Sequence, residues 1–128
     1  MKKDNKGFSL VELIIVIAIM AVLVGLLAPQ YLKYVENSKV STDISNAQEV
    51  ATAINVAFAD DNGSYKSGAN PTVLPDGKSL PALKATGAGP KMVVTIDDNG
   101  VKLITDGKYE LWPDPKKAGT GYYTVHHK

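Results

Sequence analysis

The sequence predicts an α+β fold, in which a long N-terminal α-helix packs against a small antiparallel sheet of three or four strands. A dense apolar block over residues 8–30 predicts the membrane-spanning half of that helix. An apolar stripe at helical spacing over 31–62 predicts its amphipathic half. Short alternating runs within 92–128 predict the sheet and C-terminal region, and residues 63–91 form the loop between helix and sheet.

The apolar block runs from Phe8 to Ala28, which at about 1.5 Å per residue spans roughly 30 Å, the thickness of a hydrocarbon core. Lys2, Lys3 and Lys6 precede the block, and the positive-inside bias keeps such a leader in the cytoplasm. A secretory signal has a shorter apolar core followed by a small-residue cleavage site. Here the run continues into a helical pattern, so we expect a single-pass membrane segment that stays with the protein.

Two features interrupt the apolar block. A carboxylate such as that of Glu12 costs about 2.5–3.5 kcal/mol at the centre of a membrane helix. We therefore expect either a charged partner for Glu12 or, since it lies about one turn inside the run, snorkelling to the lipid headgroups.

Pro29 lacks a backbone donor and clashes with the carbonyl of Gly25, a residue type that itself weakens a helix. We expect a helix break at Gly25 and Pro29, in the form of a bend more than of unwinding.

The second half of the predicted helix carries apolar residues at spacings of three and four. This stripe consists of Val40, Ile44, Ala47, Ala51, Ile54 and Phe58. The other positions, which we expect to face away from it, include Lys39, Asp43, Asn46, Glu49 and Asn55. We expect the helix to end near residues 59–63, with Gly63 in the left-handed conformation of a C-terminal cap.

Beyond the helix, residues 64–90 are rich in proline and glycine, which predicts a long loop with at most one short turn at 79–85. Period-two runs then predict antiparallel strands. The strands expected are Met92–Ile96, Val101–Thr105, Lys108–Trp112 and, near the end, 121–127. The turn signals between the first three are Asn99-Gly100 and Asp106-Gly107.

The composition argues against several classes of function. All 14 basic residues are lysines scattered among 13 acidic ones, so nothing indicates nucleic acid as a partner. The absence of cysteine excludes disulfides, thiol catalysis and zinc–thiolate sites. We expect no catalytic residue, no cofactor and no metal site, since His126 and His127 are adjacent and would point apart on a strand. The triplet Asn62-Gly63-Ser64 is a formal glycosylation sequon without an assigned role.

The start of the apolar block carries a specific motif. It consists of a basic leader that ends in glycine, then phenylalanine, a small hydroxyl residue, two apolar residues and a glutamate. The matching residues are Lys6, Gly7, Phe8, Ser9, Leu10, Val11 and Glu12. Together with the long apolar run, this motif resembles the N-terminus of type IV pilins and the related pseudopilins, and most of all that of a major type IV pilin. The resemblance covers about the first quarter of the chain.

The resemblance implies that residues 1–7 are a leader, which a prepilin peptidase removes by cutting between Gly7 and Phe8. Phe8 would then be N-methylated, and Glu12 would pair with the N-terminal amine of a neighbouring subunit. Identical copies would polymerise through their helices into a helical filament, with the help of the inner-membrane pilus assembly machinery. The expected product is a structural subunit of a type IV pilus and not an enzyme. It would lie in the inner (cytoplasmic) membrane as a single-pass precursor and in the extracellular pilus afterwards.

Two alternatives stay open from the sequence. The first is a major pseudopilin of a type II secretion or DNA-uptake system, which uses the same kind of helix for a shorter fibre. Secretion pseudopilins often bind calcium through acidic residues, but Asp114 is the only acidic residue after Glu110. The second is a membrane-anchored binding domain that never polymerises. Many pilins close their C-terminal region with a disulfide, so this region must here be held by packing, backbone bonds or neighbouring subunits.

Overall fold

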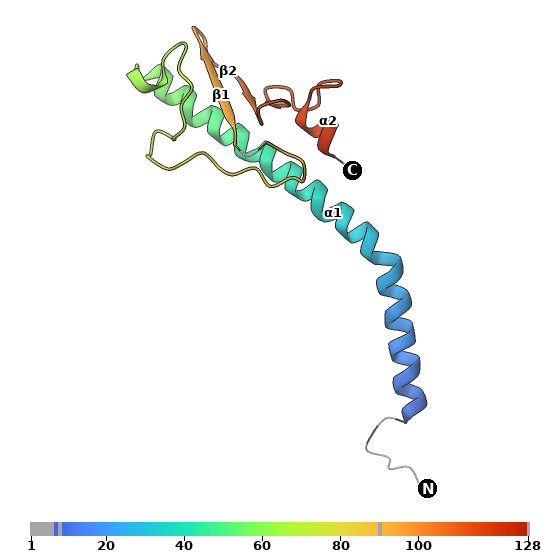
Figure 1. Ribbon diagram of the computed structural model, residues 1–128. Helices are drawn as coiled ribbons and strands as arrows, with labels where there is room; N and C mark the ends of the chain where they lie inside the picture. Colours follow the sequence, from blue (N-terminus) through green and yellow to red (C-terminus); the bar gives the residue numbers. More distant parts are fainter. Residues whose placement is uncertain (1–6, 8, 90, 128) are drawn as a thin grey trace. The chain divides into compact units, whose positions relative to one another are not determined.

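The computed structural model describes residues 7, 9–89 and 91–127, and it confirms the α+β fold (Figure 1). The elements are the helix α1 (Leu10–Ala59), the 3₁₀ turn η1 (Gly63–Tyr65), the strands β1 (Val93–Asp97), β2 (Gly100–Thr105) and β3 (Glu110–Trp112), and the short helix α2 (Tyr122–His126). The chain divides into two compact units, Met1–Tyr34 and Val35–Lys128. The second unit is called the head below, and α1 contributes residues to both units.

The first unit contains the apolar part of α1. Gly25 and Pro29 both lie inside the helix, which keeps its helical assignment through the predicted break. No atom lies within 4 Å of the position that a Cβ of Gly25 would occupy. The helix α1 therefore continues past Pro29, although this residue has no backbone N–H to donate. A bend or unwinding at this point stays a prediction.

The head packs the rest of α1 against a three-stranded antiparallel sheet of order β1-β2-β3. In Figure 1, β1 and β2 lie along this part of the helix. The predicted apolar stripe is confirmed: Val40, Ala47, Ala51 and Ile54 are buried, and Ile44 and Phe58 are partly buried against the same core. On the sheet side, the core includes Val94, Ile96, Ile104 and Leu111. This packing stabilises the second half of α1, since most helical stability in proteins comes from an apolar face that is covered.

Two residues of the helix were assigned to the wrong face. Asn55, expected on the polar side, is half-buried and its Oδ1 accepts from the backbone N–H of Val101 in β2 at 2.8 Å. Asp43, expected on the polar side, has no exposed surface. Its position explains the burial, because it lies three residues after Val40 and four before Ala47, in the middle of the buried stripe. A charged side chain is tolerated there because hydrogen-bond donors surround its carboxylate, as described below.

The helix ends where it was expected, but a different residue forms its cap. Asp61, and not Gly63, takes the left-handed conformation, with φ 59°. The backbone N–H of Asn62 donates to the carbonyl of Ala57 at 3.1 Å and that of Asp61 donates to Phe58 at 3.1 Å, which is the Schellman pattern. Gly63 instead begins η1. Aspartate is one of the few residues besides glycine that visit this conformation readily.

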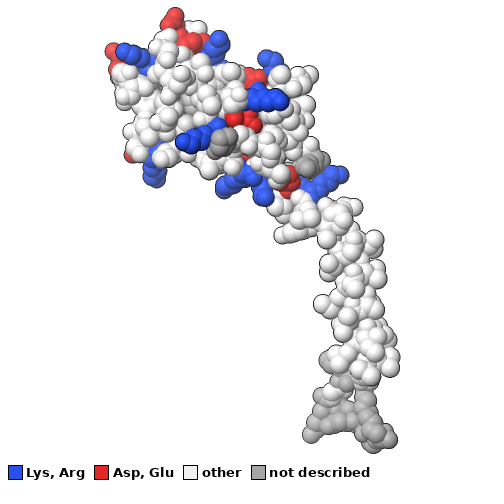
Figure 2. All heavy atoms as spheres, viewed as in Figure 1, with Lys and Arg blue, Asp and Glu red and all other residues white. Residues whose placement is uncertain are grey.

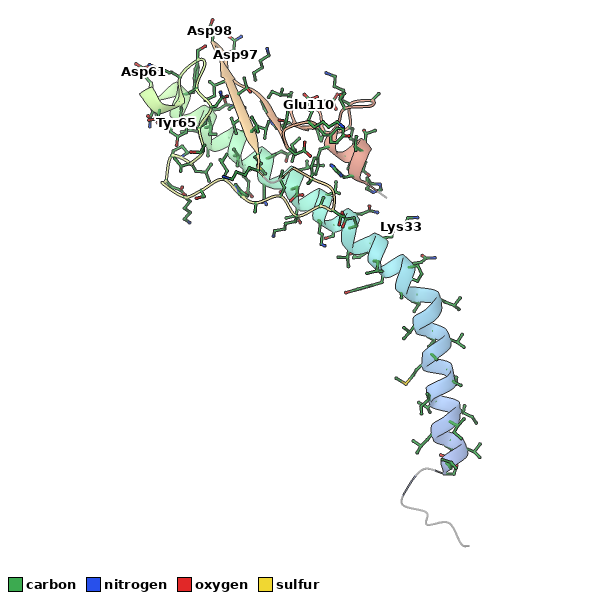
Figure 3. All side chains as sticks on the ribbon, viewed as in Figure 1. Lys33, Asp61, Tyr65, Asp97, Asp98 and Glu110 are labelled. Atoms are coloured by element: carbon green, nitrogen blue, oxygen red, sulfur yellow. The ribbon has the colours of Figure 1, made fainter. Side chains whose placement is uncertain are left out.

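The predicted hairpin is confirmed, with its turn displaced by one residue. The pairing of Asp97 with Gly100 leaves Asp98 and Asn99 as the loop, where the sequence had suggested Asn99-Gly100. Gly100 has φ 115°, and a Cβ there would lie 2.5 Å from Oδ1 of Asn55 on α1. The glycine thus serves a left-handed position and the close packing of the hairpin on α1. Figure 3 shows Asp97 and Asp98 at the hairpin tip.

The expected fourth strand is wrong, because the segment forms the helix α2. The chain meets the edge of β3 through a single bridge between Glu110 and Gly121, with the N–H of Glu110 donating to Thr120 O at 2.8 Å. It then turns into α2, where Tyr122 and His126, four residues apart, are both buried. An i,i+4 buried pair is a helical pattern, and in so short a segment the alternation of strand residues looks much the same.

The connecting loop is irregular, as predicted. Within its described residues it contains η1 and the isolated bridges Val73–Ser79 and Ala82–Lys91. Residues 79–84 contain no turn or helix, so the short turn allowed for at 79–85 is absent from the structure.

Candidate functional site

The most unusual surface of the described chain is the apolar part of α1. Its large apolar side chains between Leu10 and Leu32 are each at least 48% exposed. They are Leu10, Val11, Leu13, Ile14, Ile15, Val16, Ile17, Ile19, Met20, Val22, Leu23, Val24, Leu26, Leu27 and Leu32, with Tyr31 among them. On the face drawn in Figure 2, the N-terminal part of α1 shows only uncharged residues, whereas charged side chains gather on the head. A helix that is apolar on all sides needs cover from a membrane or from other helices.

The described part of the chain contains one helix that is long and apolar enough to cross a membrane, namely α1. Its apolar stretch has the length that a hydrocarbon core requires. The exposed apolar residues are far too contiguous for the scattered apolar surface of an ordinary soluble protein. This surface is therefore the first candidate for a functional role.

Glu12 lies in the first turn of α1 and is bonded to Ser9. The hydroxyl of Ser9 donates to Oε1 of Glu12 at 3.0 Å, and the backbone N–H of Glu12 donates back to Oγ of Ser9 at 3.2 Å. Ser9 thus caps the helix, and the carboxylate stands at its N-terminus, where the helix dipole favours negative charge. This pair was not predicted from the sequence, although serine followed three residues later by glutamate before an apolar run is a capping signal.

The other predicted site residues lie at the start of the chain. Gly7 is exposed, with no described atom within 4 Å of the place that a Cβ would take. Phe8 lies outside the described residues. Cleavage between Gly7 and Phe8, N-methylation of Phe8 and the contact of Phe8 with Glu12 therefore stay predictions.

The head contains a second group of bonded carboxylates, which was not predicted from the sequence. Asp43 accepts hydrogen bonds from the backbone N–H groups of Lys84 (2.9 and 3.0 Å) and Ala85 (2.9 Å), and from the hydroxyl of Tyr122. Burial and the hydrogen bond to Asp43 raise the pKa of Tyr122 well above its ordinary value. This buried carboxylate joins α1, the loop and α2 at one point.

Glu36, seven residues before Asp43 on α1, holds the next residue of the loop. Its carboxylate accepts from the backbone N–H of Thr86 at 2.5 Å and from the Thr86 hydroxyl at 3.0 Å. Lys39 approaches the same carboxylate at 3.9 Å. Two helical carboxylates on one face of α1 therefore bind three consecutive loop residues, which gives this loop a fixed course over the helix.

Asp106, in the turn between β2 and β3, also binds backbone N–H groups through its carboxylate. It accepts from the backbone N–H groups of Gly89 (3.2 Å), Lys108 (2.9 Å) and Tyr109 (2.6 Å). Burial pushes the pKa of Asp106 upward, but the three N–H bonds together with the nearby His126 outweigh it, and the net shift of the pKa is downward. Nε2 of His126 in α2 lies 3.6 Å from Asp106 Oδ2.

These buried carboxylates hold the fold together. Each one is engaged by backbone donors, and the described residues contain no group of three or more His, Cys, Asp or Glu side chains suited to a metal ion. The C-terminal region is tied in further by the N–H of Tyr123, which donates to Pro115 O at 2.7 Å, and by that of Gly121, which donates to Lys117 O at 2.8 Å. Packing and backbone bonds thus hold the C-terminal region, which is one of the ways expected from the absence of cysteine.

Comparisons with known proteins bear on the N-terminal motif and on most of the chain. Residues 2–28 match the family model described as the prokaryotic N-terminal methylation motif. The type IV major fimbrial protein FimA of Dichelobacter nodosus is 33% identical over 117 residues, which cover 84% of this chain and 75% of that protein. The fimbrial protein EcpC of Eikenella corrodens is 32% identical over 116 residues, covering 84% of this chain and 73% of that protein.

A fimbrial protein of Pseudomonas aeruginosa is 38% identical over 56 residues, which cover 44% of this chain and 36% of that protein. No solved structure gives a significant match.

Proposed function

The chain is a member of the type IV fimbrial protein family, and we propose that, as a structural subunit of a type IV pilus, it is cleaved between Gly7 and Phe8, N-methylated at Phe8 and polymerised through α1. The family is one of structural fimbrial subunits and not of enzymes. The filament would consist of identical copies arranged helically. The partners proposed for its formation are a prepilin peptidase and the inner-membrane pilus assembly machinery.

The observation that carries this proposal is the exposed apolar surface of α1 between Leu10 and Leu32. Covering one aliphatic side chain of this size is worth about 1.5–3 kcal/mol. With so many such side chains, the subunit needs a bilayer around this segment before assembly and the helices of other subunits afterwards. The two environments correspond to a single-pass precursor in the inner (cytoplasmic) membrane and to an extracellular pilus.

Glu12 supplies the selectivity that apolar packing lacks. Apolar helices attract one another in many registers, whereas a carboxylate in an apolar medium is stabilised by a cation at one place. In the proposed filament that cation is the N-terminal amine of a neighbouring Phe8. Within the subunit, the bond from the Ser9 hydroxyl already stabilises the carboxylate at the helix end. Assembly would then add an ion pair with the neighbouring ammonium group to the hydrogen bond from Ser9, in an apolar medium where an opposite charge counts most.

Three variants of the full chain test this role in cells. Glu12→Ala removes charge and hydrogen-bond acceptor, and it should leave leader cleavage intact but abolish filaments. Glu12→Gln keeps an acceptor for Ser9 without the charge, and it should also lose most filaments if the charge is what counts. Ser9→Ala removes the cap alone, and it should lower the filament yield far less than either change at Glu12.

The measurements are leader cleavage by mass spectrometry and filament yield by electron microscopy and shearing. Normal piliation of Glu12→Ala would sink the proposal. The length of the wild-type fibres under native expression separates the pseudopilin alternative, which predicts short fibres, from long surface pili.

A further inference from the structure

The proposed function leaves one sequence motif without a role, the triplet Asn62-Gly63-Ser64. It has the N-x-S/T pattern, in which an asparagine amide is glycosylated when the middle residue is not proline. Of the seven asparagines in the chain, only Asn62 fits this pattern. Asn70-Pro71-Thr72 has the same spacing but proline in the middle, so it offers a natural negative control within the same loop.

The triplet lies on an exposed turn directly after α1. Residues 59–64 are all exposed, and no atom lies within 4 Å of the position that a Cβ of Gly63 would take. Firm contacts hold the turn on both sides. The Schellman cap of α1 precedes it, and Tyr65, which is buried and donates its hydroxyl to Val73 O at 2.8 Å, follows it. Figure 3 shows Asp61 and Tyr65 at this end of α1. A bulky hydrophilic group fits here without disturbing the core.

The side chain of Asn62 is oriented by a local hydrogen bond. Its Oδ1 accepts from the backbone N–H of Ser64 at 3.1 Å, which makes an Asx turn. This bond uses the oxygen of the carboxamide and not Nδ2, the atom that a sugar would join. The same bond holds Ser64, the hydroxyl residue of the pattern, close to the carboxamide.

We propose that Asn62, in the exposed turn shaped by its hydrogen bond from the backbone N–H of Ser64, is an N-glycosylation site. The co-substrate is an oligosaccharide carried on a lipid diphosphate. In the reaction, Nδ2 of Asn62 forms a bond to C1 of the first sugar and loses one proton. The bond from C1 to the diphosphate oxygen breaks, and the lipid diphosphate leaves with the electron pair of that bond and takes up the proton. Each subunit would carry one glycan beyond the C-terminal end of α1.

This inference rests on the membrane topology within the proposed function. A leader kept in the cytoplasm places the head on the opposite side of the membrane. A membrane-bound transferase that uses a lipid-linked donor on that side would meet the head while the precursor is still anchored. Polymerisation itself is not required, so the modification can be measured in subunits from membranes as well as in filaments.

The experiment is the intact mass of the full-length subunit from its native cells, taken from membranes and from sheared filaments, with peptide mapping of residues 59–66. The wild-type subunit is expected to be heavier than its processed chain by one oligosaccharide. Asn62→Asp keeps an oxygen for the Ser64 N–H but has no amide nitrogen, and Ser64→Ala keeps the backbone N–H but has no hydroxyl. Both should lose the added mass, whereas Ser64→Thr and Asn70→Asp should keep it.

The inference is overturned if the wild-type subunit has the mass of its processed chain alone, if it differs only by deamidation at Asn62, or if the added mass persists in Asn62→Asp. A subunit that carries the sugar but forms no filaments would contradict the proposed assembly and support the glycosylation. Filaments without the sugar would do the reverse.

Discussion

The two parts of α1 use similar apolar residues in opposite ways. Ile17, in the first unit, is 65% exposed, whereas Ile54, in the head, has no exposed surface. The core that covers Ile54 is built by the sheet, the loop and α2 of the same chain. Ile17 and its neighbours have to be covered by other molecules. One helix can thus contribute to folding through its part in the head and to association through its part in the first unit.

The carboxylates of the two parts differ in the same manner. Asp43 is fully buried and is held by two backbone N–H groups and a tyrosine hydroxyl from distant parts of the chain. Glu12 is exposed, and the bonds described for it come from Ser9, three residues earlier. We therefore expect substitutions at Asp43 to act on the stability of the head and substitutions at Glu12 to act on assembly.

The largest effect on the head is expected from Asp43→Ala. The change leaves the N–H groups of Lys84 and Ala85 and the hydroxyl of Tyr122 buried without their acceptor. Each buried donor left without a partner costs about 1–3 kcal/mol, so three of them predict a loss of several kcal/mol. Denaturant unfolding of the full chain in detergent, followed through Trp112, measures this loss. An unfolding free energy within 1 kcal/mol or so of the wild type would contradict the view that Asp43 joins three elements.

A pair of neighbouring residues on α1 sharpens the contrast between covered and uncovered apolar side chains. Ile54→Ala should destabilise the head by about 2–5 kcal/mol, since it leaves a cavity in the core. Val56→Ala, at a position that is 58% exposed, should change the unfolding free energy by less than about 0.5 kcal/mol. Ile17→Ala should leave the unfolding of the head unchanged and reduce the filament yield. A loss of head stability in Ile17→Ala would break the comparison.

The smallest effect is a pH dependence that arises from Asp106. Its pKa is lowered from an ordinary value of 3.8, so the charged form stabilises the fold above that pH, and this contribution is lost as the pH falls through the lowered value. The variant Asp106→Asn should be less stable at neutral pH, and its unfolding free energy should fall less steeply below about pH 4. Unfolding of both proteins along a pH series checks this. If the unfolding free energies of the two proteins fall with the same slope at acid pH, Asp106 contributes nothing to the pH dependence.

The sequence alone was sufficient for the main architecture, because α1 and the hairpin depend on local patterns. Apolar spacing located the buried stripe from Val40 to Phe58, and the glycine after Asn99 located the hairpin. The burial of Asp43 was not predicted, because its partners Lys84 and Ala85 lie 41 and 42 residues away and no local pattern predicts such a contact. The helix α2 was missed because five residues are too few to separate helical from strand periodicity.

The candidate assembly site was predictable to a different extent. The motif from Lys6 to Glu12 and the apolar run are contiguous, so they could be recognised without the fold. The spacing of Ser9 and Glu12 also predicts the capping bond between them. The expectation for Glu12 considered a partner in another subunit and not this local bond. The apolar surface of α1 has to be covered by other molecules. The sequence of one chain shows that this cover must be apolar, but it does not identify the molecule that provides it.

The central claim, that other copies of the chain cover the apolar part of α1 in the filament, can be tested by thiol labelling. The chain has no cysteine, so single cysteines report one position each. In intact filaments, Ile17→Cys should be protected from a water-soluble maleimide and should react fully once the filaments are denatured. Asn99→Cys, at the exposed hairpin turn, is the matched control and should react in both states. Labelling of Ile17→Cys in intact filaments as fast as in denatured protein would contradict the account.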